Sequence, residues 1–285
     1  MSSKQKCGRG IMMILSPAKT LDLSPYVGNV QKLTHADCDL DRTAEVAKSL
    51  KKRKDLKQLL GVSENIANTA LKYWEAFTIE DSKRNSESKP CIYAFSGAAY
   101  QALRIQDCSQ EAVDYLQRNL RIIDPVYGIL RPLDQIQPYR LEMATKNVLP
   151  NVAKLADFWK ESVTRRLSGE IGLRATPILL NLASDEYSAA VAPDELPENI
   201  HYVKVIFRED GRVISVHAKR ARGLMVQFLA ENNIQTMEGV KSFDQEGYGF
   251  VVAYSDDTTL VFERSKGTHK RPAPSIASSK AKKAR

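Results

Sequence analysis

Residues 11–15 read Ile-Met-Met-Ile-Leu, and Ser16-Pro17-Ala18-Lys19-Thr20 follows them directly. Five apolar residues stopped by Ser-Pro predict a short buried strand, and residues 177–182 (PILLNL) predict a second one. Open α/β sheets bind ligands at loops that follow the carboxyl ends of parallel strands. Lys19 and the hydroxyl of Thr20 therefore suit a phosphate or another anion, although a strand-ending turn with a solvated lysine also fits this pattern.

Further periodic segments continue the alternation of strands and helices. Helices are predicted at residues 41–60, 63–77, 109–119, 151–167 and 219–231, and strands at 91–95, 121–123, 202–207, 212–217, 249–254 and 259–263. The last four strands suggest two antiparallel hairpins, one across residues 209–211 and one across 256–257. The pattern predicts an α/β (α+β) fold: a single compact domain with a mixed β-sheet flanked by helices.

The charge of the chain is concentrated in its tails. The formal net charge is +8, of which residues 1–11 contribute +3 and residues 265–285 contribute +7. The body, residues 12–264, therefore has a net charge of −2. We expect a basic N-terminal extension (1–11), one folded domain (12–264) and a disordered basic C-terminal tail (265–285). The whole-chain charge alone does not indicate nucleic-acid binding by the folded part.

Composition excludes several classes of protein. No apolar run approaches the roughly 18 residues that span a membrane, and the apolar stretch near the N-terminus is too short for a secretory signal. The four cysteines are widely spaced without a CxxC motif, so we expect reduced thiols, a cytoplasmic location and no zinc site. The histidines show no metal-ligand spacing, and no cofactor is expected. The terminal sequence KAKKAR (280–285) is compatible with a nuclear address.

Residues 124–143 combine a glycine turn with charges of both signs. Two prolines bracket a turn centred on Gly128, and such a turn between short helices can expose backbone N–H groups to a nucleic-acid phosphate, as in a helix-hairpin-helix element. Arg131, Asp134, Arg140 and Glu142 follow within a short distance. They predict either a polar site or structural salt bridges that fix a long irregular segment.

Two later segments place charges where helices are expected to begin. Ser184 can cap a helix whose first turn holds Asp185 and Glu186, which the helix dipole favours; alternatively, one of these acids is a general base or a Mg²⁺ ligand. Lys219 and Arg222 stand near the predicted start of the next helix, where the dipole disfavours cations. A bound anion would offset that cost, so this segment points to a phosphate-bearing ligand.

Five motifs in these segments resemble the peroxide stress resistance protein YaaA family. They are SPAKTLD (16–22), YGILRPLD (127–134), QPYRLEM (137–143), NLASDEY (181–187) and KRARGLM (219–225), and the resemblance covers residues 12–264. It implies a single-domain α/β fold, a helix-hairpin-helix element, DNA binding, and protection from hydrogen peroxide linked to limiting free iron. The motif cations are Lys19, Arg131, Arg140, Lys219 and Arg222, and the motif acids are Asp134, Glu142, Asp185 and Glu186.

Two functional hypotheses follow from the motifs. In the first, a non-enzymatic stress protein binds DNA by shape or structure without strong sequence preference. Its phosphate contacts come from Lys19, Thr20, Gly128, Arg131, Arg140, Lys219 and Arg222. In the second, the protein is an enzyme acting on a nucleotide or nucleic-acid base, with Glu142, Asp185 and Glu186 as candidate catalytic acids or bases. The oligomeric state is not indicated by the sequence.

Overall fold

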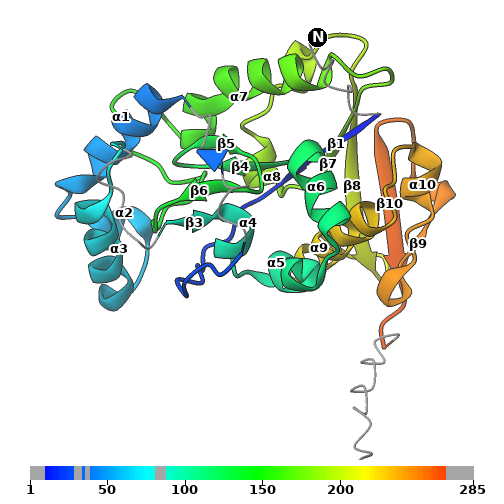
Figure 1. The fold of residues 1–285 in the computed structure, drawn as a ribbon, viewed down its shortest axis with the longest axis horizontal. Coiled ribbons are helices and arrows are strands. Elements are labelled where there is room, and N and C mark those ends of the chain that lie inside the picture. The colour runs from blue at the N-terminus through cyan, green and yellow to red at the C-terminus, as the bar shows by residue number, and fades with distance from the viewer. Residues whose placement is uncertain (1–9, 29–33, 36–38, 81–87, 268–285) are drawn as a thin grey trace, which may run out of the picture.

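Seven strands form the main sheet, in the order β5-β4-β1-β7-β8-β10-β9 (Figure 1). The computed structural model describes residues 10–28, 34–35, 39–80 and 88–267. The strands are β1 (Ile11–Leu15), β4 (Leu120–Asp124), β5 (Gly128–Leu130), β7 (Ile178–Asn181), β8 (His201–Glu209), β9 (Gly249–Phe250) and β10 (Thr259–Arg264). The five inner strands are parallel, and the edge strands β5 and β9 pair antiparallel to their neighbours, so the sheet is mixed.

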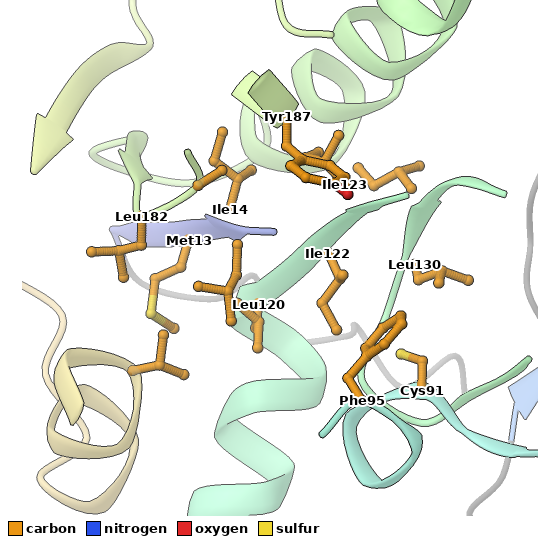
Figure 2. Close-up of a cluster of buried hydrophobic side chains, with 14 of the residues drawn as sticks. Met13, Ile14, Cys91, Phe95, Leu120, Ile122, Ile123, Leu130, Leu182 and Tyr187 are labelled. Carbon is orange, nitrogen blue, oxygen red and sulfur yellow. The ribbon is translucent and has the colours of Figure 1, made fainter. Parts of the chain in front are cut away.

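The predicted strand at residues 11–15 lies inside the sheet, between β4 and β7. Met13 is in register with Leu120 on one side and Leu180 on the other. All five residues of β1 are at most 1% exposed. An inner parallel strand is covered on both faces and therefore reads as a continuous apolar run. Figure 2 shows this core, with Ile123 beside Tyr187 on one side of β4 and Ile122 on the other side.

Helices cover both faces of the sheet. They are α1 (Leu40–Lys51), α2 (Leu56–Leu60), α3 (Glu64–Ala76), α4 (Cys91–Ala94), α5 (Ala98–Leu103), α6 (Gln110–Asn119), α7 (Leu155–Ile171), α8 (Asp185–Ser188), α9 (Ser215–Glu231) and α10 (Met237–Lys241). Helix α6 packs on β1 and β4, and α9 packs on β8, α6 and α5. Helix α7 contacts β5 on the other side of β4. A second sheet of β2 (Thr34–His35), β6 (Asp134–Ile136) and β3 (Lys89–Pro90) lies beside α4.

The mixed α/β fold in one domain is therefore confirmed, and local residues fix the ends of several elements. Ser109 caps α6 by accepting a hydrogen bond from the N–H of Ala112 (3.2 Å). Gly61 ends α2 in the left-handed conformation, with φ of 60°. The last predicted hairpin is formed by β9 and β10, although β9 has only two residues. Cys91 and Cys108 are free thiols, as expected for these two positions.

Two predicted strands are wrong. Residues 91–94 form the short helix α4, because a brief apolar run cannot be told from a buried helix by its periodicity. Residues 212–217 form one isolated bridge, Glu209 to Arg212, before α9 begins at Ser215. The reason is topological: β8 already has β7 on one side and β10 on the other, so no free edge remains for a hairpin partner.

The predicted helix-hairpin-helix around Gly128 is also wrong, because this segment is the β4–β5 hairpin. Asp124 pairs with Gly128 across the hairpin. The Asp124 carboxylate accepts the N–H groups of Val126 (2.8 Å) and Tyr127 (3.0 Å), so these donors are used inside the protein. Gly128 has φ of 73°, and a Cβ atom there would lie 2.6 Å from the Trp159 ring. Gly128 is thus a buried turn residue held against α7, not an exposed phosphate contact.

Both ends of the chain lie largely outside the described residues. The predicted basic N-terminal extension and C-terminal tail, and with the tail the predicted nuclear address, fall mostly in residues 1–9 and 268–285. None of the helices in the described part of the chain is long and apolar enough to cross a membrane.

Candidate functional site

A pocket of about 290 Å³ lies at the carboxyl ends of β1 and β7. The chain leaves β1 toward β4 and leaves β7 toward β8, on opposite sides, so the two strands flank a switch point of the sheet. The pocket is lined by Leu15, Ser16, Pro17, Ala18, Lys19, Thr20, Gly97, Ala98, Ala99, Tyr100, Leu182, Ser184, Glu186, Tyr187, Lys219 and Arg222. Three of the five motif segments therefore meet in one cavity.

Hydrogen bonds fix the loops that follow the two strands. The Ser16 hydroxyl accepts the N–H of Ser184 (2.9 Å) and lies 3.2 Å from the Ser184 hydroxyl. The Tyr100 hydroxyl donates to the carbonyl of Ser16 (2.9 Å). The Asn181 side chain accepts the N–H of Ala183 (2.8 Å) at the end of β7. These bonds hold the floor of the pocket in one conformation, which favours binding of a ligand at low entropic cost.

A close helix crossing brings α9 to the pocket. A Cβ atom at Gly223 would lie 1.9 Å from the carbonyl oxygen of Ala99, so only glycine allows α9 to approach α5 this closely. The crossing places Lys219 and Arg222 beside the loop that precedes α5. Helix α9 begins four residues before the predicted start, so both cations lie in the second turn or later and not at the N-terminus.

Arg222 is the cation with the least compensation. Its side chain is mostly buried, and burial lowers the pKa of the guanidinium, an effect that the charge of Asp185 partly opposes. Within the described part of the chain, the buried Nε of Arg222 has no hydrogen-bond partner. No ion pair joins Arg222 or the exposed Lys219 to an acid anywhere in residues 10–28, 34–35, 39–80 or 88–267. The pocket therefore holds positive charge that these parts of the chain do not neutralise.

Lys19 and Arg140 meet at the rim of the pocket. The Lys19 ammonium lies 2.5 Å from the Glu142 carboxylate. Arg140 donates to the carbonyl of Lys19 (2.8 Å) and lies 3.5 Å from the same carboxylate. The Lys19 side chain is 48% exposed, so it remains accessible to a ligand while it is paired. Two cations share one acid here, which leaves this cluster positive.

The three candidate acids have different surroundings. Glu186 lines the pocket, and its carboxylate accepts the N–H of Ala144 (3.2 Å). Glu142 belongs to the rim cluster with Lys19. Asp185 is 82% exposed and pairs with Lys204 at 2.7 Å outside the pocket. Burial raises the pKa of Tyr187, near Glu186, and of Tyr100, so both phenols stay protonated, and Tyr100 uses its proton in the bond to the Ser16 carbonyl.

Sequence similarity to known proteins extends over most of the chain, including the segments that form the pocket. The chain matches the sequence profile of the family described as peroxide stress protein YaaA over residues 11–253. The chain belongs to this family. It is 37% identical over 262 residues to a UPF0246 protein of Aliivibrio fischeri (strain MJ11), a match that covers 90% of this chain and 99% of the relative. It is also 36% identical over 262 residues to a UPF0246 protein of Chromobacterium violaceum, covering 90% and 100%.

Membership in the YaaA family confirms the resemblance that the five motifs carry. It supports a role in the peroxide stress response. The DNA-binding and iron-related parts of the expectation remain proposals.

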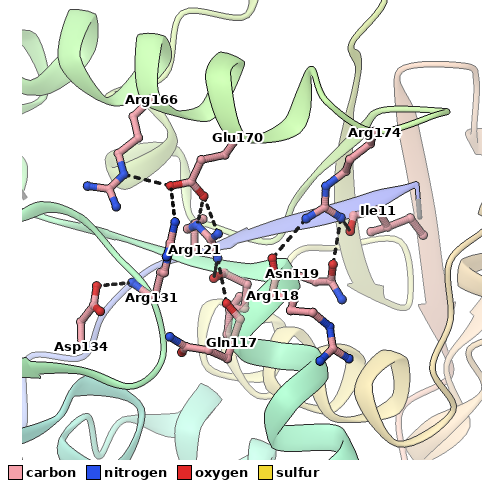
Figure 3. A network of polar contacts seen from close by, with 11 residues as sticks. Ile11, Gln117, Arg118, Asn119, Arg121, Arg131, Asp134, Arg166, Glu170 and Arg174 are labelled. Carbon is pink, nitrogen blue, oxygen red and sulfur yellow. Dashed lines mark hydrogen bonds and ion pairs between the residues drawn. The ribbon is translucent and has the colours of Figure 1, made fainter. Parts of the chain in front are cut away.

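One YaaA-family motif cation lies away from the pocket. Arg131 follows β5 and pairs with Glu170 of α7 at 3.3 Å (Figure 3). Glu170 also pairs with Arg121 of β4 and with Arg166 at 3.0 Å. The acid of the same motif, Asp134, is buried and accepts the backbone N–H of Arg131 (2.8 Å). The alternative of structural salt bridges therefore describes this motif best.

Sequence reasoning missed the wall of the pocket formed by residues 97–100. Tyr100 is buried in the cavity, yet nothing in its spacing relates it to the cations of α9. Gly223 carried a usable signal, because a glycine inside a helical pattern marks a close approach. The described residues contain no group of three or more His, Cys, Asp or Glu side chains that could hold a metal ion.

Proposed function

We propose that this YaaA-family protein binds DNA through phosphate contacts at the pocket and acts in the cytoplasm, where it protects against peroxide damage and limits the effect of free iron. The phosphate contacts come from Lys19, Thr20, Arg140, Lys219 and Arg222. Gly128 is buried and Arg131 is engaged with Glu170, so neither belongs to this surface.

The observation that carries the proposal is the local excess of positive charge. The body of the chain is slightly acidic, yet two cations in the pocket have no acidic partner among the described residues, and two more at its rim share one acid. Concentrating cations on an otherwise acidic protein costs free energy unless an anion binds there. The DNA backbone is the anion that the family resemblance suggests.

The proposed contacts favour structure over sequence. Lysine and arginine contacts to phosphate position a protein on DNA without reading bases. A pocket of about 290 Å³ is too small for a duplex and can admit only one nucleotide unit. We therefore expect tighter binding to DNA with accessible single-stranded parts or ends than to an uninterrupted duplex.

The test is DNA binding by the full-length protein across a salt series, with duplex, bubble and single-stranded DNA of equal length. Replacing Lys19 and Lys219 by glutamine should weaken binding about tenfold at 0.1 M salt and reduce the slope of log K against log [salt] by about 2. Because the tails are unchanged in this variant, they cannot produce the difference. Lys72→Gln, an exposed lysine on α3, is the control and should keep the slope. Equal slopes for all three proteins would sink the proposal.

A second candidate function is an enzyme that acts on a nucleotide or nucleic-acid base. The observation that favours it is Glu186, a carboxylate inside the pocket beside Tyr187 and the unpaired cations. Phosphate anchoring together with a carboxylate suits acid–base chemistry. Glu186→Gln keeps the shape of the side chain and should leave DNA affinity within about twofold, because the contact to the Ala144 N–H can persist. Loss of peroxide protection in complemented cells by this variant would support the enzyme, and full protection would exclude Glu186 as its catalytic group.

A further inference from the structure

The pocket holds a mostly buried arginine, Arg222, for which the described part of the chain supplies no ion-pair partner. Arg222 lies on the face of α9 that lines the cavity, and its Nε is buried without a hydrogen bond. Removing a charge from water is expensive unless another charge or several hydrogen bonds compensate it. Asp185 influences Arg222 electrostatically, but its carboxylate is occupied by Lys204. A negatively charged group that binds in the pocket would supply the counter-charge and the hydrogen bonds that the described part of the chain does not give Arg222.

The charges around the pocket specify how negative that group is. The cations are Lys19, Arg140, Lys219 and Arg222, and the acids are Glu142 and Glu186. Four positive groups against two carboxylates leave an excess of two, and the Asp185–Lys204 pair next to them is neutral. An internal phosphodiester carries one negative charge, whereas a phosphate monoester carries about two at neutral pH. The balance matches the monoester.

The shape of the cavity leads to the same ligand. An internal phosphodiester has a nucleotide on each side, and a pocket of about 290 Å³ between two loops and a helix has room for one. A phosphate at the end of a strand, or on a free nucleotide, is attached to only one nucleotide. The walls offer accessible apolar surface from Pro17, Ala18 and Ala98 for a sugar or a base. Arginine also binds a terminal phosphate through two parallel hydrogen bonds.

We infer that the pocket binds a dianionic phosphate monoester, the terminal phosphate of a DNA strand or of a mononucleotide, with Arg222 as its innermost contact. This inference rests on the proposed function in so far as it assigns which phosphate of DNA enters the pocket. Lys19 and Lys219 lie at the exposed side of the cavity and contact the same phosphate or the next one along the strand.

The experiment compares hairpin DNAs that differ only at their ends: hydroxyl at both ends, phosphate at the 5′ end, or phosphate at the 3′ end. Affinity of the full-length protein is measured by fluorescence anisotropy at 0.1 M salt. We expect one phosphorylated end to bind about tenfold more tightly than the hydroxyl ends. Arg222→Gln should bring this ratio close to one. Arg222→Lys, which keeps the charge and loses the paired hydrogen bonds, should give an intermediate ratio.

Arg220→Gln is the matched control. Arg220 lies two residues away on α9 and pairs with Glu246 at 2.5 Å, away from the pocket-lining residues. Its replacement removes the same charge from the same helix and should keep the tenfold ratio. Circular dichroism of each variant establishes that a changed ratio does not come from unfolding.

A second arm uses mononucleotides and nucleosides, with binding measured by calorimetry. If DNA binds with equal affinity whatever its ends, the inference is overturned while the proposed function stands. If no DNA binds but a mononucleotide binds in an Arg222-dependent way and its nucleoside does not, the proposed function is overturned and the pocket is a site for free nucleotides. If neither binds, both are overturned.

Discussion

Two clusters of cations in this protein look alike in sequence and differ in what surrounds them. Arg121, Arg131 and Arg166 converge on the carboxylate of Glu170, between β4, the end of β5 and α7 (Figure 3). Arg222 lies in the pocket at the ends of β1 and β7 without an ion pair in the described part of the chain. The arginines of the first cluster share a carboxylate of the protein, whereas Arg222 has no such partner among the described residues.

The difference separates structural cations from cations that await a ligand. Burial alone raises the pKa of Glu170, but the charges of Arg121 and Arg131 outweigh burial, so the pKa lies below its usual value. That shift expresses stabilisation of the folded state by the ion pairs. At Arg222 the dominant effect is desolvation, which lowers the pKa of the guanidinium and expresses a cost. Removing charge should therefore have opposite effects on stability in the two clusters.

The largest effect is expected from Glu170→Gln. This change leaves three arginines without their shared carboxylate, and Arg121 has a side chain only 5% exposed. Breaking a buried ion pair from one side typically costs about 3 to 5 kcal/mol, so we expect the free energy of unfolding to fall by about 3 kcal/mol in urea denaturation. DNA affinity should stay the same under conditions where the variant is folded.

Glu161→Gln on the same helix is the control for Glu170. Glu161 is 73% exposed and pairs with Arg165 at the surface, so its replacement should change stability by no more than about 0.5 kcal/mol. Equal losses for both variants would mean that the Arg121–Glu170 cluster is no stronger than a surface pair.

The next effect concerns Asp124, a buried carboxylate of β4 that pairs with no cation in the described part of the chain. Burial raises its pKa to about 6, against the hydrogen bonds from Tyr139, Tyr127 and Val126. Because the folded pKa lies above the unfolded value of 3.8, Asp124 contributes stability below about pH 4 that is lost as the pH rises through about 6. Between pH 4 and 7 the wild type should lose about 2 to 3 kcal/mol relative to Asp124→Asn in urea denaturation. Parallel stability curves for the two proteins would refute the raised pKa.

The sequence predicted the sheet well where burial alone decides the pattern. Residues 11–15, and 177–182 apart from Asn181, are apolar because inner parallel strands are covered on both faces, and such runs are recognisable without knowing their neighbours. The predicted strand at 212–217 is wrong because β8 already pairs with β7 and β10. The partner β10 comes later in the chain, so the local sequence could not show that both edges of β8 are occupied. Pairing between distant strands is a tertiary property that local periodicity does not contain.

The site was predictable in its parts and not in their arrangement. The motifs indicated Lys19, Glu186, Lys219 and Arg222, and these residues line one pocket. They also indicated Arg131, whose chemistry is the same and whose partner on α7 is 39 residues away. Residue type shows that a cation is present, whereas the presence of a facing carboxylate, which decides its role, depends on the packing of α7 against β5.

The smallest effect, and the sharpest test of the contrast, comes from removing one arginine from each cluster. Arg222→Gln should leave the free energy of unfolding unchanged or raise it by about 1 kcal/mol, because it removes a desolvated charge that has no ion pair among the described residues. Arg166→Gln removes an arginine that is also mostly buried but pairs with Glu170 at 3.0 Å, and should lower the free energy of unfolding by about 1 to 2 kcal/mol. Both are measured by urea denaturation without added ligand. If Arg222→Gln destabilises as much as Arg166→Gln, Arg222 is a structural residue, and the unpaired charge in the pocket no longer argues for a bound phosphate.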